Sequence, residues 1–93
     1  MRNYELMIIY NTEEKGLTEG LEHVKNFFQS HNVEIINEKD YGMRDLAYPI
    51  EKKKRGHYYL FNIKTEQANL AKINKDFKLY KPILRYLILK QEA

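Results

Sequence analysis

Apolar residues recur along this chain at two spacings, one typical of strands and one typical of helices. Between residues 3 and 11, large side chains occupy every second position: Tyr4, Leu6, Ile8 and Tyr10. Because alternate residues of a strand point to opposite faces, we expect a first strand whose even-numbered residues face the core.

A helical period follows, with apolar residues spaced at i, i+4, i+7 and i+11: Leu17, Leu21, Val24 and Phe28. This stripe predicts an amphipathic helix from Lys15 to Ser30. We expect Asn32 to end the helix and Gly20 to weaken it, because glycine costs a helix interior up to about 1 kcal/mol relative to alanine.

Residues 33 to 50 are strand-like but are interrupted by Gly42, and a glycine there commonly marks a bulge or a sharp bend. Pro49 cannot donate a hydrogen bond to a neighbouring strand, so this strand should lie at an edge of the sheet. A loop over Glu51 to Gly56 should connect it, as a hairpin, to a third strand. There, three core-facing residues alternate with three outward-facing ones: Tyr59, Phe61 and Ile63 with Tyr58, Leu60 and Asn62.

Thr65 is suited to cap a second helix, with Glu66 in its first turn. The apolar stripe of this helix is Leu70, Ile73 and Phe77. Pro82 should stop the helix before a final strand from Ile83 to Lys90.

The resulting order predicts an α+β fold: a ferredoxin-like βαββαβ arrangement, with a four-stranded antiparallel sheet and two helices on one face. Ninety-three residues support one hydrophobic core, so we expect a single domain over residues 1–93. Because this fold carries many unrelated functions, the fold does not decide between them.

Composition narrows the function classes. The chain has no cysteine, and so offers no disulfide framework, thiolate metal site or thiol nucleophile. Its apolar runs are too short for a signal peptide or a membrane span, so we expect a cytoplasmic protein without a membrane partner. Residues 1–40 carry eight acids and four bases, whereas residues 41–93 carry five acids and twelve bases, an asymmetry that favours a surface facing a polyanion.

Catalytic and metal chemistry has little support. Ser30 and His31 are adjacent at a helix end and therefore point in different directions, and the three histidines lack the spacing of metal ligands. We expect no enzyme, cofactor, metal or small-molecule substrate. An acylphosphatase-like enzyme would need a cradle of backbone amides after the first strand, where Glu13 and Glu14 would instead repel phosphate. A small-molecule regulatory domain of the amino-acid-binding type stays open, because its ligand contacts are largely made by backbone.

Four consecutive positive charges are the strongest binding signal: Lys52, Lys53, Lys54 and Arg55. Neutralising phosphates dominates affinity for nucleic acid, although charge at a hairpin tip also resists edge aggregation. Arg2 precedes the first strand, and Arg85 should project from the last strand opposite the core; each suits a phosphate contact or ordinary solvation. For Tyr58 and Leu60 on the uncovered face, we favour protein contact or partial packing over base stacking.

Three blocks, in order and consistently spaced, carry a family resemblance: Met1-Arg2-Asn3-Tyr4-Glu5; then Gly42, Arg44, Leu46-Ala47-Tyr48-Pro49-Ile50, Lys52, Gly56 and Tyr58; and then Leu84-Arg85-Tyr86-Leu87 through Lys90. With them the chain resembles the bacterial small-subunit ribosomal protein S6 family over essentially its whole length. It stops at Ala93, soon after the last strand, so we expect no charged C-terminal extension of the kind some members have.

The resemblance implies a structural protein that binds the central domain of small-subunit ribosomal RNA together with ribosomal protein S18, through a joint surface. The RNA-facing residues implied for this chain are Arg2, Lys52, Lys53, Lys54, Arg55 and Arg85. The partner protein should lie against an exposed part of the sheet.

Overall fold

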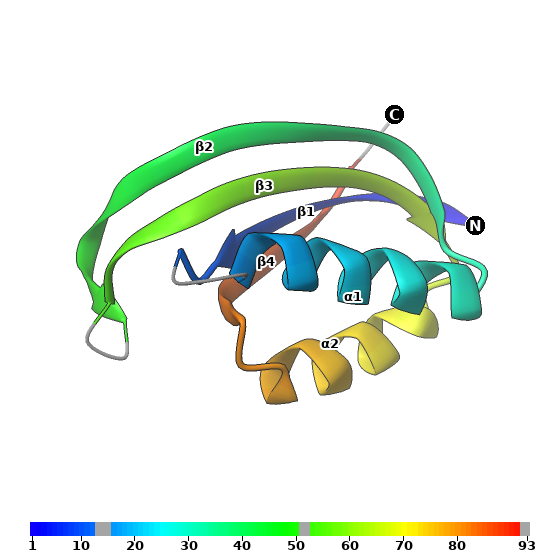
Figure 1. The fold of residues 1–93 in the computed structure, drawn as a ribbon. Coiled ribbons are helices and arrows are strands. Elements are labelled where there is room, and N and C mark those ends of the chain that lie inside the picture. Colours follow the sequence, from blue (N-terminus) through cyan, green and yellow to red (C-terminus); the bar gives the residue numbers. More distant parts are fainter. Residues whose placement is uncertain (13–15, 51–52, 92–93) are drawn as a thin grey trace.

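The alternating and helical patterns fold into a four-stranded antiparallel sheet with two helices on one face, in a computed structural model that describes residues 1–12, 16–50 and 53–91 (Figure 1). Along the chain the elements are β1 (Arg2–Tyr10), α1 (Gly16–Ser30), β2 (Glu34–Ile50), β3 (Lys53–Thr65), α2 (Asn69–Leu79) and β4 (Ile83–Lys90). The predicted ferredoxin-like order is confirmed. The sheet order is β2-β3-β1-β4, so the second strand lies at an edge, as Pro49 indicated.

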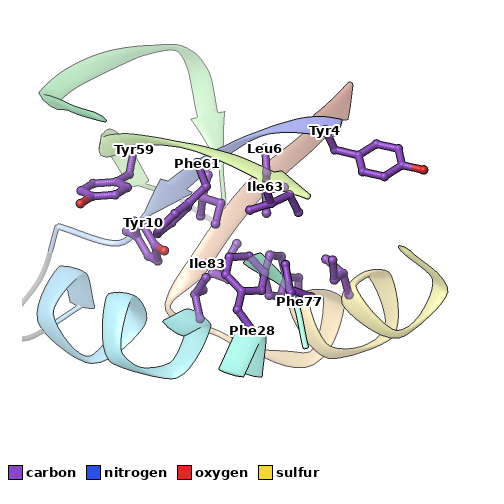
Figure 2. Close-up of a cluster of buried hydrophobic side chains, with 13 residues drawn as sticks. Tyr4, Leu6, Tyr10, Phe28, Tyr59, Phe61, Ile63, Phe77 and Ile83 are labelled. Carbon is purple, nitrogen blue, oxygen red and sulfur yellow. The ribbon is translucent and has the colours of Figure 1, made fainter. Parts of the chain in front are cut away.

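The hydrophobic core lies between the sheet and the helices (Figure 2). The side chains that β1 directs toward the helices are all buried: Tyr4, Leu6, Ile8 and Tyr10. Phe28 of α1 and Phe77 of α2 enter the same cluster, and the ring of Phe28 meets that of Phe61 edge-on, with centroids 5.6 Å apart. Full burial of one such side chain contributes roughly 1.5–3 kcal/mol, so these rings do much to hold both helices on the sheet.

Asn32 ends α1 as predicted. Its φ of 56° is the left-handed conformation that often follows the last helical turn. The backbone N–H of Val33 then donates a hydrogen bond to the carbonyl oxygen of Phe28 at 2.9 Å, which satisfies one of the carbonyl groups that a helix end leaves without a partner.

The prediction that Thr65 caps α2 is wrong. Thr65 is the last residue of β3, where it pairs with Arg2 of β1 and is fully buried. Its hydroxyl oxygen accepts a hydrogen bond from Nδ2 of Asn69 at 2.8 Å, and α2 begins only at Asn69. Glu66 therefore precedes the helix. The packed face of α2 is nevertheless the predicted one: Leu70, Ile73 and Phe77.

Gly20 has a packing function that its low helix propensity did not indicate. A Cβ atom at this position would overlap the ring atoms Cδ1 and Cε1 of Tyr10. Tyr10 is fully buried at the end of β1, and its ring meets that of Tyr59 edge-on, with centroids 6.4 Å apart. Burial raises the pKa of the Tyr10 phenol well above its ordinary value, because the ionised form would lose its hydration. The missing side chain at Gly20 thus lets α1 approach the sheet closely.

Glu38 connects the edge strand β2 to β3 and to α1. The hydroxyl group of Tyr59 donates a hydrogen bond to Oε1 of Glu38 at 2.5 Å, and Nζ of Lys25 lies 3.0 Å from the same oxygen. The hydrogen bond from Tyr59, followed by the interaction with Lys25, holds the pKa of Glu38 below its ordinary value despite partial burial. Burial, followed by this carboxylate, raises the pKa of Tyr59 to about 12.

We expect Gly20→Ala to destabilise the protein by roughly 1–3 kcal/mol, because the added methyl group forces the Tyr10 ring or the helix to move. Helix propensity alone predicts the opposite sign, a gain of about 1 kcal/mol. Urea unfolding followed by circular dichroism measures the difference. The control is Asn26→Ala, at an exposed position of the same helix, which should be slightly stabilising. A stabilised Gly20→Ala variant would contradict the packing argument.

We also expect Glu38→Gln to reduce the loss of stability in acid. The pKa of Glu38 is lower in the folded chain than in the unfolded chain, where it is about 4.3. Its carboxylate therefore stabilises the fold above that pH, and this contribution disappears as the pH falls through the folded-state pKa. Urea unfolding at intervals between roughly pH 5 and pH 3 should show a shallower decline for the variant.

The control for the pH experiment is Glu34→Gln, at an exposed position of the same strand, which removes one carboxylate without removing the bond to Tyr59. The prediction fails if Glu38→Gln and the unsubstituted chain lose stability in parallel as the pH falls.

Candidate nucleic-acid interface

The hairpin formed by β2 and β3 continues past the end of β1. Tyr10 of β1 pairs with His57 of β3, whereas β3 pairs with β2 as far as Lys53, opposite Ile50. We call residues 44–50 and 53–56 the arm. In Figure 1 the arm projects beyond α1 at the left and curves downward.

The prediction of a loop over Glu51 to Gly56 is wrong for its last four residues, which belong to β3. Pairing between the two strands continues toward the tip, with Arg44 opposite Gly56 and Asp45 opposite Arg55. Lys52, one of the expected RNA contacts, lies outside the described residues. The rest of the basic run is on an extended strand, which directs neighbours such as Lys54 and Arg55 to opposite faces.

A bulge at Gly42 lies where the arm begins. Gly42 has a φ of 79° and lies at a shift in the pairing register of β2 and β3, as the sequence predicted. Oδ1 of Asp40 accepts hydrogen bonds from the Gly42 N–H at 2.7 Å and from Nε2 of His57 at 2.5 Å. Burial alone would raise the pKa of Asp40, but the hydrogen bonds from His57 and Gly42 outweigh it and lower that pKa. The carboxylate thus holds both strands at the bend.

A larger irregularity lies nearer the tip. The pairing passes from Asp45 opposite Arg55 directly to Ile50 opposite Lys53, so residues 46–49 together oppose a single residue of β3. Nε of Arg55 lies 3.2 Å from Oδ1 of Asp45 in an exposed ion pair. This bulge takes residues 46–49, which belong to the central block of the family resemblance, out of the regular ladder.

The face of the sheet opposite the helices, which we call the open face, is partly covered near the arm. A Cβ atom at Gly56 would overlap Cγ2 of Ile9 and lie 3.4 Å from Cδ2 of Leu46. Gly56, expected at the end of the loop, therefore gives room to Ile9, which is buried although it faces away from the helices. Leu60 on the same face is also buried, in agreement with the partial packing that we favoured.

Arg85 projects from β4 on the open face, as predicted, where it lies opposite Ile9 of β1. Its Nη1 atom donates a hydrogen bond to the hydroxyl oxygen of Tyr48, and its guanidinium carbon lies 5.9 Å from the centre of the Tyr48 ring. Because β2 and β4 are the two edges of the sheet, this contact means that the arm reaches across the end of β1. Nothing in the sequence pattern indicated that these two residues meet.

Four of the expected RNA contacts therefore lie at one end of the molecule: Lys53, Lys54, Arg55 and Arg85. Arg2 lies at the other end of β1, opposite Thr65, roughly 25 Å away for a strand of this length. Strand alternation also puts Arg2 on the helix side of the sheet, whereas Arg85 is on the open face.

Arg44 adds a further exposed positive charge at the arm end. Its neighbour Asp45 pairs with Arg55, while the guanidinium carbon of Arg44 lies 5.9 Å from the centre of the Tyr41 ring. The ammonium group of Lys39 lies 5.0 Å from the same ring centre. The sequence signal for this cluster is weak, because Asp40, Gly42 and Met43 separate its residues and no consecutive basic run marks it.

The chemistry available at this end of the molecule is the binding of anions by positively charged side chains. Across the described ranges, no group of three or more His, Asp and Glu residues could hold a metal ion. Nor is any helix in that part of the chain long and apolar enough to cross a membrane. Arginine and lysine side chains on an extended hairpin, next to tyrosine rings, are instead suited to phosphates and exposed bases.

Comparison with known proteins gives one consistent result. The family model described as ribosomal protein S6 matches residues 3–90. The small ribosomal subunit protein bS6 of Treponema denticola is 40% identical over 92 residues, which cover 99% of both chains. That of Fusobacterium nucleatum is 34% identical over 94 residues, covering 99% of this chain and all of the relative.

A solved structure agrees with the sequence relatives. The crystal structure of 30S ribosomal protein S6 from Thermotoga maritima superposes with a TM-score of 0.86 at 26% sequence identity, covering 97% of this chain and 87% of that one. The family match, the two relatives and this structure all extend over nearly the whole length. The chain therefore belongs to the ribosomal protein S6 family.

Proposed function

We propose that this chain binds the central domain of small-subunit ribosomal RNA together with ribosomal protein S18. Membership of the ribosomal protein S6 family makes the chain a structural protein of the small ribosomal subunit, working in the cytoplasm, and not an enzyme. The proposal adds which part of the RNA it binds, with which partner protein, and through which residues.

The observation that carries the RNA part of the proposal is the concentration of cations on and beside the arm. Exposed Arg44, Lys54 and Arg55 lie on the arm, and Arg85 reaches it from the other edge of the sheet. Each cation that contacts a phosphate releases condensed counterions, and this release supplies much of the affinity for RNA. The extended hairpin presents these charges on both of its faces, so it can follow a phosphate backbone along its length.

The open face next to β4 supports a contact with the partner protein. Met7, Ile9, Tyr58 and Leu87 line a groove there, together with Arg85 and Tyr86. Leu87 and Leu89 of β4 expose 56% and 50% of their surfaces. Two exposed leucines beside a largely apolar groove favour protein contact over phosphate contact. We therefore propose that S18 contacts the apolar part of this groove and β4, and that the RNA contacts the arm and Arg85.

We expect Lys53→Ala combined with Lys54→Ala to weaken binding to a central-domain RNA fragment, measured by fluorescence anisotropy with S18 present. Losing two phosphate contacts should reduce the slope of log affinity against log salt concentration by about one per contact. Circular dichroism should show that the variant remains folded.

The matched control is Lys72→Ala combined with Lys75→Ala, which removes the same charge from exposed positions of α2 on the helix side of the sheet. This variant should keep the salt slope. Equal losses of affinity in both double variants would mean that the RNA responds to the net charge of the protein and not to the arm. If the unsubstituted chain with S18 fails to bind the fragment, the proposed function is wrong.

A further inference from the structure

The contact between Tyr48 and Arg85 joins the two edge strands of the sheet. The two residues are 37 positions apart in the chain, and β3 and β1 lie between their strands. The hydrogen bond and the ring contact act together, because the guanidinium of Arg85 lies near the ring face of Tyr48 while it donates to the hydroxyl group. Arg85 is thereby directed toward the arm.

Apolar packing supports this arrangement from the sheet. Ile9, opposite Arg85 in β1, packs against the backbone of Gly56 in the arm. Leu46, two residues before Tyr48, approaches the same position. This packing fixes the arm relative to β4. The contact between Tyr48 and Arg85 lies next to it.

Lys54 belongs to the same surface. It lines a shallow hollow together with Tyr48 and Pro49, and strand alternation directs it to the open face, on which Arg85 also lies. Tyr48 is thus next to cations from two different strands. Asp45, the acidic residue described in the arm, also lines this hollow, and its carboxylate forms an ion pair with Arg55.

The exposure of Tyr48 favours a function in binding over a function in packing. A tyrosine that served packing alone would be covered, yet 56% of the surface of Tyr48 is exposed. An arginine on a solvated strand loses rotamer entropy when it binds a ligand. A contact that restricts Arg85 in the free protein lowers that cost, and the hydrogen bond to Tyr48 uses one of the five N–H donors of the guanidinium.

We propose that Tyr48 is a positioning residue of the RNA-binding surface, which holds Arg85 beside Lys54 so that β4 and the arm present one phosphate-binding face. This inference rests on the proposed function, since it concerns the same RNA surface. It assigns Tyr48 to RNA binding through another residue, and not through base stacking.

The test is a double-mutant cycle in salt-dependent binding to the central-domain RNA fragment, with S18 present. Arg85→Ala should lower the salt slope by about one, and Tyr48→Ala should lower it by a similar amount. The double variant should lose no more than Arg85→Ala alone, because Tyr48 acts through Arg85. Tyr48→Phe, which keeps the ring but loses the acceptor, should fall between the unsubstituted chain and Tyr48→Ala.

The matched control is Met43→Ala, which shortens another exposed side chain of β2 and should leave the salt slope unchanged. Additive losses in the double variant would overturn the proposal, because they would mean that Tyr48 contacts RNA by itself. A Tyr48→Ala variant that lowers the free energy of unfolding at an unchanged salt slope would reduce Tyr48 to a structural residue. A loss of S18 affinity alone would assign the pair to the protein partner.

A second measurement without RNA separates this proposal from the proposed function. Nitrogen-15 relaxation of the Arg85 side chain in the free protein should show greater motion in Tyr48→Ala than in Met43→Ala or the unsubstituted chain. Unchanged Arg85 motion would overturn the positioning function even if RNA binds. Absence of RNA binding by the unsubstituted chain would overturn the proposed function, and with it the contribution of Tyr48 to RNA binding.

Discussion

The end of β1 holds the molecule together from both faces of the sheet, and each face requires a glycine. Tyr10 packs against Gly20 of α1 on the helix side, while its neighbour Ile9 packs against Gly56 of the arm on the open face. Both glycines allow backbone to approach a large side chain more closely than any other residue would permit. The position of α1 and the position of the arm therefore depend on two consecutive residues of one central strand. Packing in the core and the placement of the cationic surface are coupled through these two residues.

The elements of the fold could be predicted because their periods are clear: alternation marks β1 and β3, and an apolar stripe marks each helix. The two errors came from strand pairing that the local sequence pattern does not show. Thr65 looked like a helix cap, but Arg2 at the start of the chain extends the ladder to it. Likewise, the basic run looked like a loop because pairing inside the arm leaves no alternating apolar pattern. The packing function of Gly20 could not be predicted either. Helix propensity gives the cost of a glycine in a helix but does not show that the Tyr10 ring lies against it.

The candidate site was less predictable than the fold. Composition and the run of basic residues indicated a polyanion-binding surface, and alternation directed Arg85 to the open face. Neither could show that Arg85 meets Tyr48, because the two residues lie on opposite edges of the sheet and the bulge at residues 46–49 breaks the alternation that would have oriented Tyr48. Arg2 illustrates the converse: the family resemblance grouped it with the arm residues, whereas the pairing of β1 puts it at the far end.

The bulges of β2 have a consequence for the chain before it meets its partners. An edge strand of 17 residues would ordinarily offer a long row of backbone hydrogen-bonding groups to the edge of another molecule. In β2 the pairing register shifts at three places, between Ile35 and Asn37, Asp40 and Gly42, and Asp45 and Ile50. Each shift bends and twists the edge, and Pro49 removes a further donor near the tip. The irregularities that shape the arm therefore also hinder edge-to-edge pairing between copies of the free chain.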